Sequence, residues 1–184
     1  MSPAPLVAVF GSSTIAPGSP AYLEAFDLGR RLALRGAGVI TGGYGGAMEA
    51  CSRGAREAGG RVVGVTVELF ERRGPVNRWV EERVHTPDLF ERLRHIISRA
   101  DGFVAVAGSV GTVTEVMLTW TLLSVSARPA APLVLLGRPW KAWLDAHRHP
   151  DLVLPHLFDF VRLADTTEEA ARLALDGVAA RPPG

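Results

Sequence analysis

The sequence has little sulfur and almost no lysine. Cys51 is its only cysteine, and Lys141 is the only lysine among 20 basic residues. A single cysteine excludes an intramolecular disulfide framework and a zinc site made of several cysteines. Lys141 lies between Trp140 and Trp143, in a segment that reads as a surface helix away from the glycine-rich turns. The sequence therefore argues against an enzyme that works through a lysine Schiff base.

Long apolar runs and a strong charge of either sign are also missing. The chain has no run of 18 apolar residues and no apolar core of a secretion signal near its start, so we expect no membrane association and a cytoplasmic location. The formal net charge of +1 argues against a nucleic-acid partner held mainly by charge. With 184 residues, 47% of them hydrophobic and 21% charged, we expect one globular domain over residues 1–184.

Short apolar runs alternate with segments of helical spacing along the chain. We expect strands at residues 6–10, 38–40, 61–67, 102–108, 132–137 and 160–164, and helices at residues 21–36, 46–58, 86–100, 112–126 and 166–180. Strands that are apolar on both faces are typical of a parallel sheet covered on both sides. The pattern predicts a doubly wound, Rossmann-like α/β fold, with a mostly parallel sheet of about six or seven strands in three α/β/α layers.

Two of these helices carry more detailed expectations. In the helix at 86–100, Thr86 is the expected N-cap and Pro87 the first helical residue. In the helix at 21–36, helical spacing predicts an inward face made of Tyr22, Phe26, Leu28, Leu32 and Leu34.

Three glycine-rich turns follow expected strands, at residues 10–13 (FGSS), 41–46 (TGGYGG) and 107–112 (AGSVGT). In a doubly wound sheet, ligands bind outside the carboxyl ends of the strands. Two of the turns lead directly into helices, whose N-termini offer free N–H groups and a partial positive charge that suit phosphate. The alternative is that the glycines only make tight turns between strands and helices.

Two familiar nucleotide motifs are absent. No G-x-G-x-x-G fingerprint follows the first strand, and no G-K-[ST] sequence occurs anywhere. The turns therefore favour a nucleotide or sugar phosphate over a dinucleotide or a hydrolysed ATP. Within them, the hydroxyl donors available to a phosphate are those of Ser12, Ser13, Ser109 and Thr112.

The sequences of these turns resemble those of the Lonely Guy family of phosphoribohydrolases, Rossmann-like proteins often labelled lysine decarboxylases. The family pattern G-G-x-x-G-x-M is matched by Gly42, Gly43, Gly46 and Met48, and the pattern P-G-G-x-G-T-x-x-E by Gly108, Gly111, Thr112 and Glu115. The segment at 89–106 is similar to the family's M-x-x-R-K helix and places its arginine at Arg92. The likeness spans about residues 7–136 and suggests a branch near the Rossmann domain of DNA-processing protein A.

The resemblance implies hydrolysis of the N-glycosidic bond of an AMP-like nucleoside 5′-monophosphate, with no cofactor and no metal. It implies that Arg92 and Glu115 are catalytic, because a carboxylate one helical turn after the loop can face the ribose while the loop holds the phosphate. The nucleotide- or phosphate-binding residues would then be Gly11, Ser12, Ser13, Gly42, Gly43, Gly46, Met48, Gly108, Ser109, Gly111 and Thr112. The resemblance also implies a homodimer or higher homo-oligomer.

The chain departs from the family pattern at three positions. Ala107 stands where the family has proline, Ser109 where it has glycine, and Leu93 where it has lysine. These changes leave open a second reading, a non-catalytic nucleotide- or cofactor-binding carrier on the same scaffold. The alternative without a functional role is that Glu115 is an ordinary acidic residue in the first turn of a helix and that Arg92 is a solvated helix arginine.

Three further segments carry predictions of their own. The helix at 112–126 is apolar around most of its circumference, so it is covered either by a second subunit or by the rest of its own chain. The basic cluster at 70–74 with Arg78 either covers the site or is a solvated loop, and the sequence favours the loop slightly. The sequence HRH at 147–149 lacks a nearby acidic or cysteine partner, so we expect no metal there.

Overall fold

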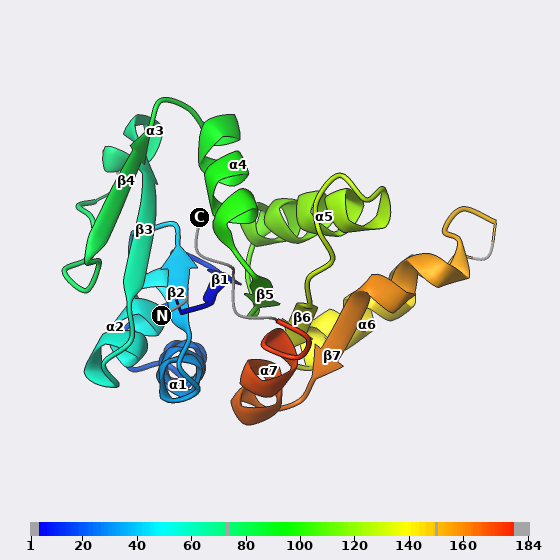
Figure 1. The fold of residues 1–184 in the computed structure, drawn as a ribbon, viewed down its shortest axis with the longest axis horizontal. Helices are drawn as coiled ribbons and strands as arrows, with labels where there is room; N and C mark the ends of the chain where they lie inside the picture. Colours follow the sequence, from blue (N-terminus) through cyan, green and yellow to red (C-terminus); the bar gives the residue numbers. More distant parts are fainter. Residues whose placement is uncertain (1–3, 73, 150, 179–184) are drawn as a thin grey trace.

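The computed structural model describes residues 4–72, 74–149 and 151–178. Its centre is a sheet of seven strands in the order β4-β3-β2-β1-β5-β6-β7, in which every neighbouring pair is parallel (Figure 1). The strands are β1 (Leu6–Phe10), β2 (Gly38–Thr41), β3 (Val62–Val67), β4 (Glu82–Thr86), β5 (Gly102–Ala105), β6 (Leu133–Leu136) and β7 (Val161–Ala164). The predicted doubly wound parallel sheet is confirmed.

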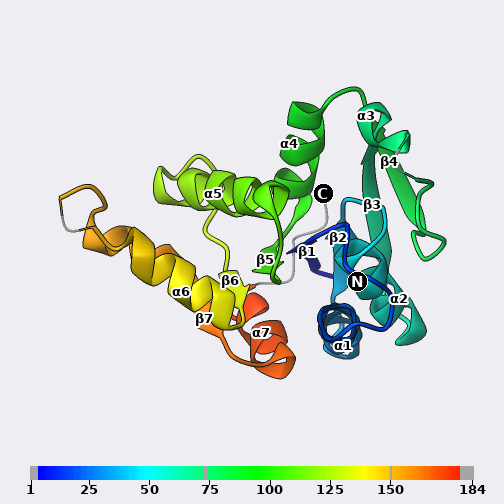
Figure 2. The same ribbon diagram turned by 180° about the vertical axis from the view of Figure 1, so that it is seen from behind.

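Helices cover both faces of this sheet, as Figures 1 and 2 show from opposite sides. One face carries α1 (Pro20–Leu34), α2 (Ala47–Glu57) and α7 (Thr167–Ala174). The other carries α4 (Leu89–Arg99), α5 (Val110–Ser124) and α6 (Arg138–His147), with the 3₁₀ segment η1 (Pro155–Phe160). The four-residue α3 (Glu68–Glu71) follows β3 directly. The predicted three layers are therefore present.

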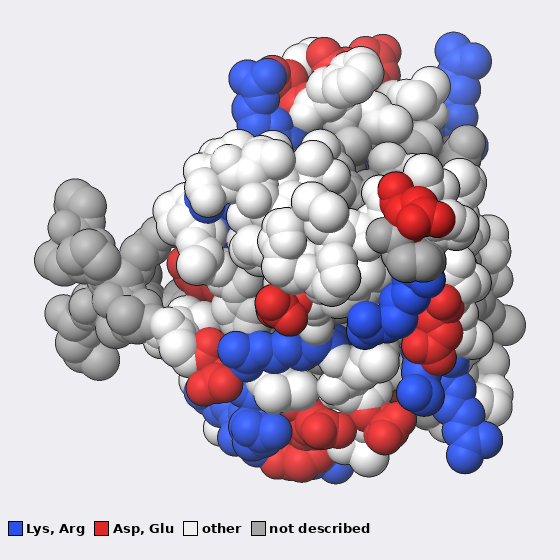
Figure 3. Space-filling model, turned by 90° about the vertical axis from the view of Figure 1, so that its right-hand side faces the viewer, with Lys and Arg blue, Asp and Glu red and all other residues white. Residues whose placement is uncertain are grey.

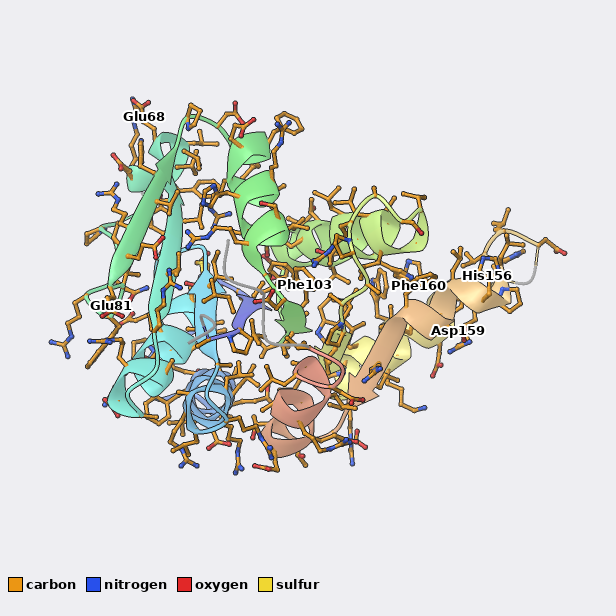
Figure 4. All side chains as sticks on the ribbon, viewed as in Figure 1. Glu68, Glu81, Phe103, His156, Asp159 and Phe160 are labelled. Carbon is orange, nitrogen blue, oxygen red and sulfur yellow. The ribbon has the colours of Figure 1, made fainter. Side chains whose placement is uncertain are left out.

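The central strands are completely buried because both of their faces are covered. β1, β2, β3, β5 and β6 are buried at every position, which is why their sequences read as unbroken apolar runs. Figure 4 shows Phe103 in the middle of the molecule; its ring lies 6.0 Å from that of Phe10 on the neighbouring strand. In the same figure Glu68 marks the carboxyl end of β3 and Glu81 the amino end of β4.

The structure corrects three details of the expected elements. Thr86 is not a helix N-cap: it is the last residue of β4, and its hydroxyl donates to the Thr66 carbonyl oxygen at 2.8 Å. The N-cap of α4 is Asp88, whose side chain accepts from the backbone N–H of Glu91. Leu34 is not an inward position, because it is the last residue of α1 and is 65% exposed.

The C-terminal helix differs from expectation as well. The C-terminal helix was expected to run from 166 to 180, but α7 ends at Ala174, and residues 179 and 180 lie outside the described part. Within the described residues, none of the helices has both the length and the apolar character needed to cross a membrane.

The order of the strands reverses between β1 and β5. From β1 the chain builds outward through β2, β3 and β4, and it then returns to the other side of β1 with β5. In open α/β sheets such a reversal leaves a crevice beyond the carboxyl ends of the two strands. The loops after β1 and β5 are two of the three glycine-rich turns, and the third follows β2.

Candidate active site at the strand reversal

A cavity of about 650 Å³ occupies this crevice. All three glycine-rich turns contribute to its wall, together with one residue from α4. Among the predicted site residues, those that line it are Gly11, Ser13, Gly42, Met48, Arg92, Ser109, Gly111, Thr112 and Glu115. The fold therefore brings together, at one edge of the sheet, residues that lie up to about a hundred positions apart in the sequence.

Four predicted residues do not line the cavity: Ser12, Gly43, Gly46 and Gly108. Their role is in the backbone conformation and packing of the turns. The Ser12 carbonyl oxygen accepts from the N–H of Ala47 at 2.8 Å, and a Cβ on Gly46 would lie 2.4 Å from that same oxygen. Gly46 also has a φ of +67°, a conformation that side-chain-bearing residues rarely adopt. Gly108 is packed against the Thr112 side chain, 2.1 Å from where its Cβ would be.

Gly42 makes room for the guanidinium of Arg92. A Cβ at Gly42 would lie 1.7 Å from Arg92 Nη2 and 2.6 Å from Met48 Sδ. Arg92 itself is only 5% exposed, so the reading of a solvated helix arginine is wrong. Its Nε donates to the Val65 carbonyl oxygen at 2.9 Å, and this hydrogen bond fixes the guanidinium at the carboxyl end of β3. A buried charge needs such partners, since isolation in the interior costs several kcal/mol.

The carboxylate of Glu115 faces this arginine. Arg92 Nη1 and Glu115 Oε1 are 3.7 Å apart, and the Glu115 side chain is 14% exposed. Burial raises the pKa of Glu115 to about 7, while the charge of Arg92 acts in the opposite direction. Burial likewise lowers the pKa of Arg92. A carboxyl group that titrates near neutrality in a cleft has the properties of a general acid or base.

The N-terminus of α5 opens into the cavity with unused donors. Ser109 is the N-cap, but its side chain makes no capping hydrogen bond. Thr112 Oγ1 is buried and has no hydrogen-bond partner among the described residues. Nothing lies within 4 Å of the place where a Cβ on Gly111 would be. The first turn of α5 thus presents backbone N–H groups next to empty space, as an anion-binding helix terminus requires.

An apolar part of the wall was missed by the sequence analysis. Tyr44, Phe70 and Pro75 line the cavity, and the rings of Tyr44 and Phe70 meet edge to face, 6.1 Å between centroids. Phe70 belongs to the arginine-rich segment for which a solvated loop was favoured; that reading is wrong for Phe70, although Arg72 and Arg78 are exposed. The available signal was one aromatic residue in a charged segment that directly follows a buried strand.

Other candidates lie away from the cavity. Leu93, at the place of the family's lysine, is 8% exposed and does not line the cavity. Lys141 has a side chain that is 66% exposed and lies 4.0 Å from Asp145. The described residues contain no group of three or more histidine, cysteine, aspartate or glutamate residues that would hold a metal ion.

Comparisons with known proteins fit this geometry. The profile of the SLOG cluster4 family matches residues 4–125. A cytokinin riboside 5′-monophosphate phosphoribohydrolase from Mycobacterium marinum is 30% identical, over 88% of this chain and 90% of its own. Two solved structures share the fold. The molybdenum cofactor binding protein of Rippkaea orientalis has a TM-score of 0.74 at 24% identity and covers 96% of this chain and 98% of its own. The molybdenum cofactor carrier protein of Chlamydomonas reinhardtii has a TM-score of 0.68 at 25% identity and covers 97% and 99%.

Proposed function

This chain belongs to the SLOG cluster4 family, relatives of the Lonely Guy phosphoribohydrolases, and from that premise we propose that it is a nucleoside 5′-monophosphate phosphoribohydrolase. The proposed reaction cleaves the N-glycosidic bond and gives a free base and ribose 5-phosphate. It uses water alone and calls for neither a cofactor nor a metal. It is not a lysine decarboxylase reaction, whatever label the family has carried.

The phosphate of the substrate would bind at the N-terminus of α5. The unused N–H groups of residues 110–112, the empty space in front of Gly111 and the partial positive charge of a fifteen-residue helix all favour a dianion there. Ser109 adds a hydroxyl group that makes no capping hydrogen bond. Its Cβ narrows the approach relative to glycine but leaves Gly111 open.

The ribose would then lie between this helix terminus and the buried pair. Glu115 is carried one turn further along α5, so its carboxylate stabilises the positive charge that develops on the ribose as the base departs. A water molecule adds its oxygen to the anomeric carbon, the electron pair of the broken C–N bond leaves with the base, and the proton released by water passes through Glu115 to the base. Arg92 anchors the nucleotide beside the reacting centre.

One observation carries this proposal above the others: the buried Arg92 and the largely buried Glu115 face each other in the wall of a cavity that also contains an open helix N-terminus. Removing a carboxylate from water is costly, and at 3.7 Å the Arg92 guanidinium compensates that cost only in part. A protein without chemistry to perform would have little reason to keep such a carboxylate in its cavity wall.

The test is direct. The purified protein is incubated with AMP, and separately with GMP, CMP and UMP, and the products are resolved by liquid chromatography. Free base and ribose 5-phosphate in equal amounts are expected from at least one of the four. Release of inorganic phosphate in place of ribose 5-phosphate would show a different reaction. Tight binding of AMP with no base released from any nucleotide would reject the enzyme.

That last outcome would favour the second candidate, a carrier that binds a nucleotide-like ligand without cleaving it. The likeness to the Chlamydomonas molybdenum cofactor carrier protein and the loss of the family's lysine at Leu93 support it. The two candidates predict the same cavity and the same phosphate site, and they differ only in whether the glycosidic bond breaks.

We further propose that the chain is one cytoplasmic domain that forms a homodimer through α5. This helix leaves Val110 81% and Met117 38% exposed, and Val125, which follows it, 64%. Figure 3 shows the side of the molecule to the right in Figure 1, toward the ends of α5 and α6; the middle of this face carries few charged side chains. Light scattering at micromolar concentration should give twice the mass of the chain, and a monomer mass would reject the dimer.

A further inference from the structure

The cavity is polar at one end and apolar at the other, and the two ends are built by different strands. Ser109, Gly111 and Thr112 follow β5, whereas Phe70 and Pro75 follow β3. In the sheet, β1 and β2 lie between these two strands. Neighbouring strands are about 4.8 Å apart, so the two ends are separated by roughly 14 Å, the scale of a whole nucleoside monophosphate.

A ligand with its phosphate at α5 therefore places its base toward the segment after β3. We propose that Phe70 is the residue that recognises the base, by contact with its planar face. This inference rests on the proposed nucleotide ligand but not on its cleavage. The substrate class that follows is any nucleoside monophosphate, with purines favoured over pyrimidines because of their larger ring area.

The surroundings of Phe70 explain why recognition would depend on the face of the base and not on its edge. The hydroxyl of Tyr44 is already committed: it donates to the Val67 carbonyl oxygen at 2.8 Å and accepts from the Val67 N–H at 3.0 Å. Met48 and Pro75 offer no strong donor. With these groups beside Phe70, the apolar end can hold any flat ring, and the described residues there offer few groups that read its hydrogen-bonding pattern.

The position of Phe70 is set by its neighbours on both sides. The Arg92 guanidinium lies over its ring, with Arg92 Cζ 5.6 Å from the ring centroid, and the ring meets Tyr44 edge to face. The next residue, Glu71, pairs with Arg83 of β4 at 2.5 Å. Since α3 has no buried residue, these contacts are what fix the wall. The Phe70 ring is thereby held at the cavity before a ligand arrives, which limits the ordering cost of binding.

The test compares two ligands that differ only by the base. Affinities for AMP and for ribose 5-phosphate are measured by calorimetry for the parent, for Phe70→Ala and for Phe70→Leu, which keeps an apolar side chain of similar bulk. The matched control is Leu69→Ala, because Leu69 belongs to the same short helix, is 64% exposed and does not line the cavity. Circular dichroism confirms that each variant is folded.

Phe70→Ala should weaken AMP binding by roughly tenfold or more, which is the usual effect of removing an aromatic side chain that stacks on a base. Phe70→Leu should weaken AMP by a smaller factor. Ribose 5-phosphate should be bound as in the parent, and Leu69→Ala should change neither ligand. An unchanged ratio between the two affinities in Phe70→Ala would overturn the proposal, as would an equal loss for both ligands. Because the readout is binding, failure here is distinct from failure to release base.

Discussion

The two glycine-rich turns that lead into helices look alike in sequence but do different work. In the turn before α2, the space left by Gly42 is filled by Arg92, and the N–H of Ala47 is already bonded to Ser12. In the turn before α5, the space in front of Gly111 is empty and the helix N-terminus has no side-chain cap. The first turn holds a protein side chain in place, and the second leaves its groups for a ligand. The number of glycines in a turn does not tell whether the turn supports a protein side chain or binds a ligand. The atoms that a Cβ would meet at each glycine do distinguish the two cases.

Gly111→Val should break the second turn with the largest effect. The valine side chain would project into the empty space, so AMP affinity should fall by roughly a hundredfold or more through lost charge-assisted hydrogen bonds. The free energy of unfolding should change by less than about 1 kcal/mol, because no protein atom is displaced. Thr114→Val is the control, since Thr114 is exposed on the same helix outside the cavity. AMP affinity equal to that of the control would contradict the ligand role of this turn.

Gly42→Ala should break the first turn in a different way, by displacing the Arg92 guanidinium. We expect turnover and AMP affinity to fall by roughly tenfold, together with a loss of stability from the disturbed buried charge. Gly45→Ala is the comparison from the same turn: it also adds a methyl group to the cavity wall, but its Cβ would lie 3.8 Å from the nearest atom and would not displace Arg92.

A double-mutant cycle sharpens this prediction. If the clash with Arg92 is the cause, Gly42→Ala should add little to the kinetic defect of Arg92→Ala, since the displaced group is gone. Full additivity of the two defects would show that Gly42 acts through something other than the arginine.

The smallest expected effect is the change of the reaction rate with pH. It concerns Glu115, which follows the second turn and faces the Arg92 side chain held by the first. Burial raises the pKa of Glu115 to about 7, so its carboxylate is lost as the pH falls through neutrality. At AMP concentrations well below KM, the rate, which reports kcat/KM, should rise roughly threefold between about pH 6.5 and about pH 7.5 and then level off. Glu115→Gln should show no such rise in its residual rate. A flat profile for the parent would mean that Glu115 does not change protonation state in the reaction.

The same pKa shift affects folding with the opposite sign. A carboxyl group whose pKa is raised in the folded state contributes stability at low pH, and this contribution disappears as the pH rises from about 4.5 through about 7. Glu115→Gln should therefore flatten the dependence of the unfolding free energy on pH in that window, as chemical denaturation at several pH values would show.

Much of the fold could be predicted from the sequence because the buried strands are short apolar runs. The edge strand β4 was missed: its exposed positions hold Arg83 and His85, so it lacks the unbroken apolar run that marks the inner strands. Thr86 was assigned to a helix because a threonine before proline has the pattern of an N-cap. Its hydrogen bond to Thr66, twenty residues earlier, exists only once β3 and β4 have paired.

The site shows the same division between local and distant information. Arg92, Glu115 and the α5 turn were assigned to the candidate site from motifs that lie in continuous segments. The reason for Gly42 was not predictable, because it depends on a contact with a residue fifty positions away. Phe70 was passed over because it stands in a charged segment, and only the fold places its ring beside Tyr44 and Arg92.

The most direct test of the account is Glu115→Gln, with base release and AMP binding measured on the same preparation. The substitution keeps the size of the side chain and removes the charge that faces Arg92 and the ribose. We predict that base release falls by roughly a hundredfold or more, as expected for the loss of one transition-state electrostatic partner, while AMP still binds. A variant that releases base as fast as the parent would contradict it.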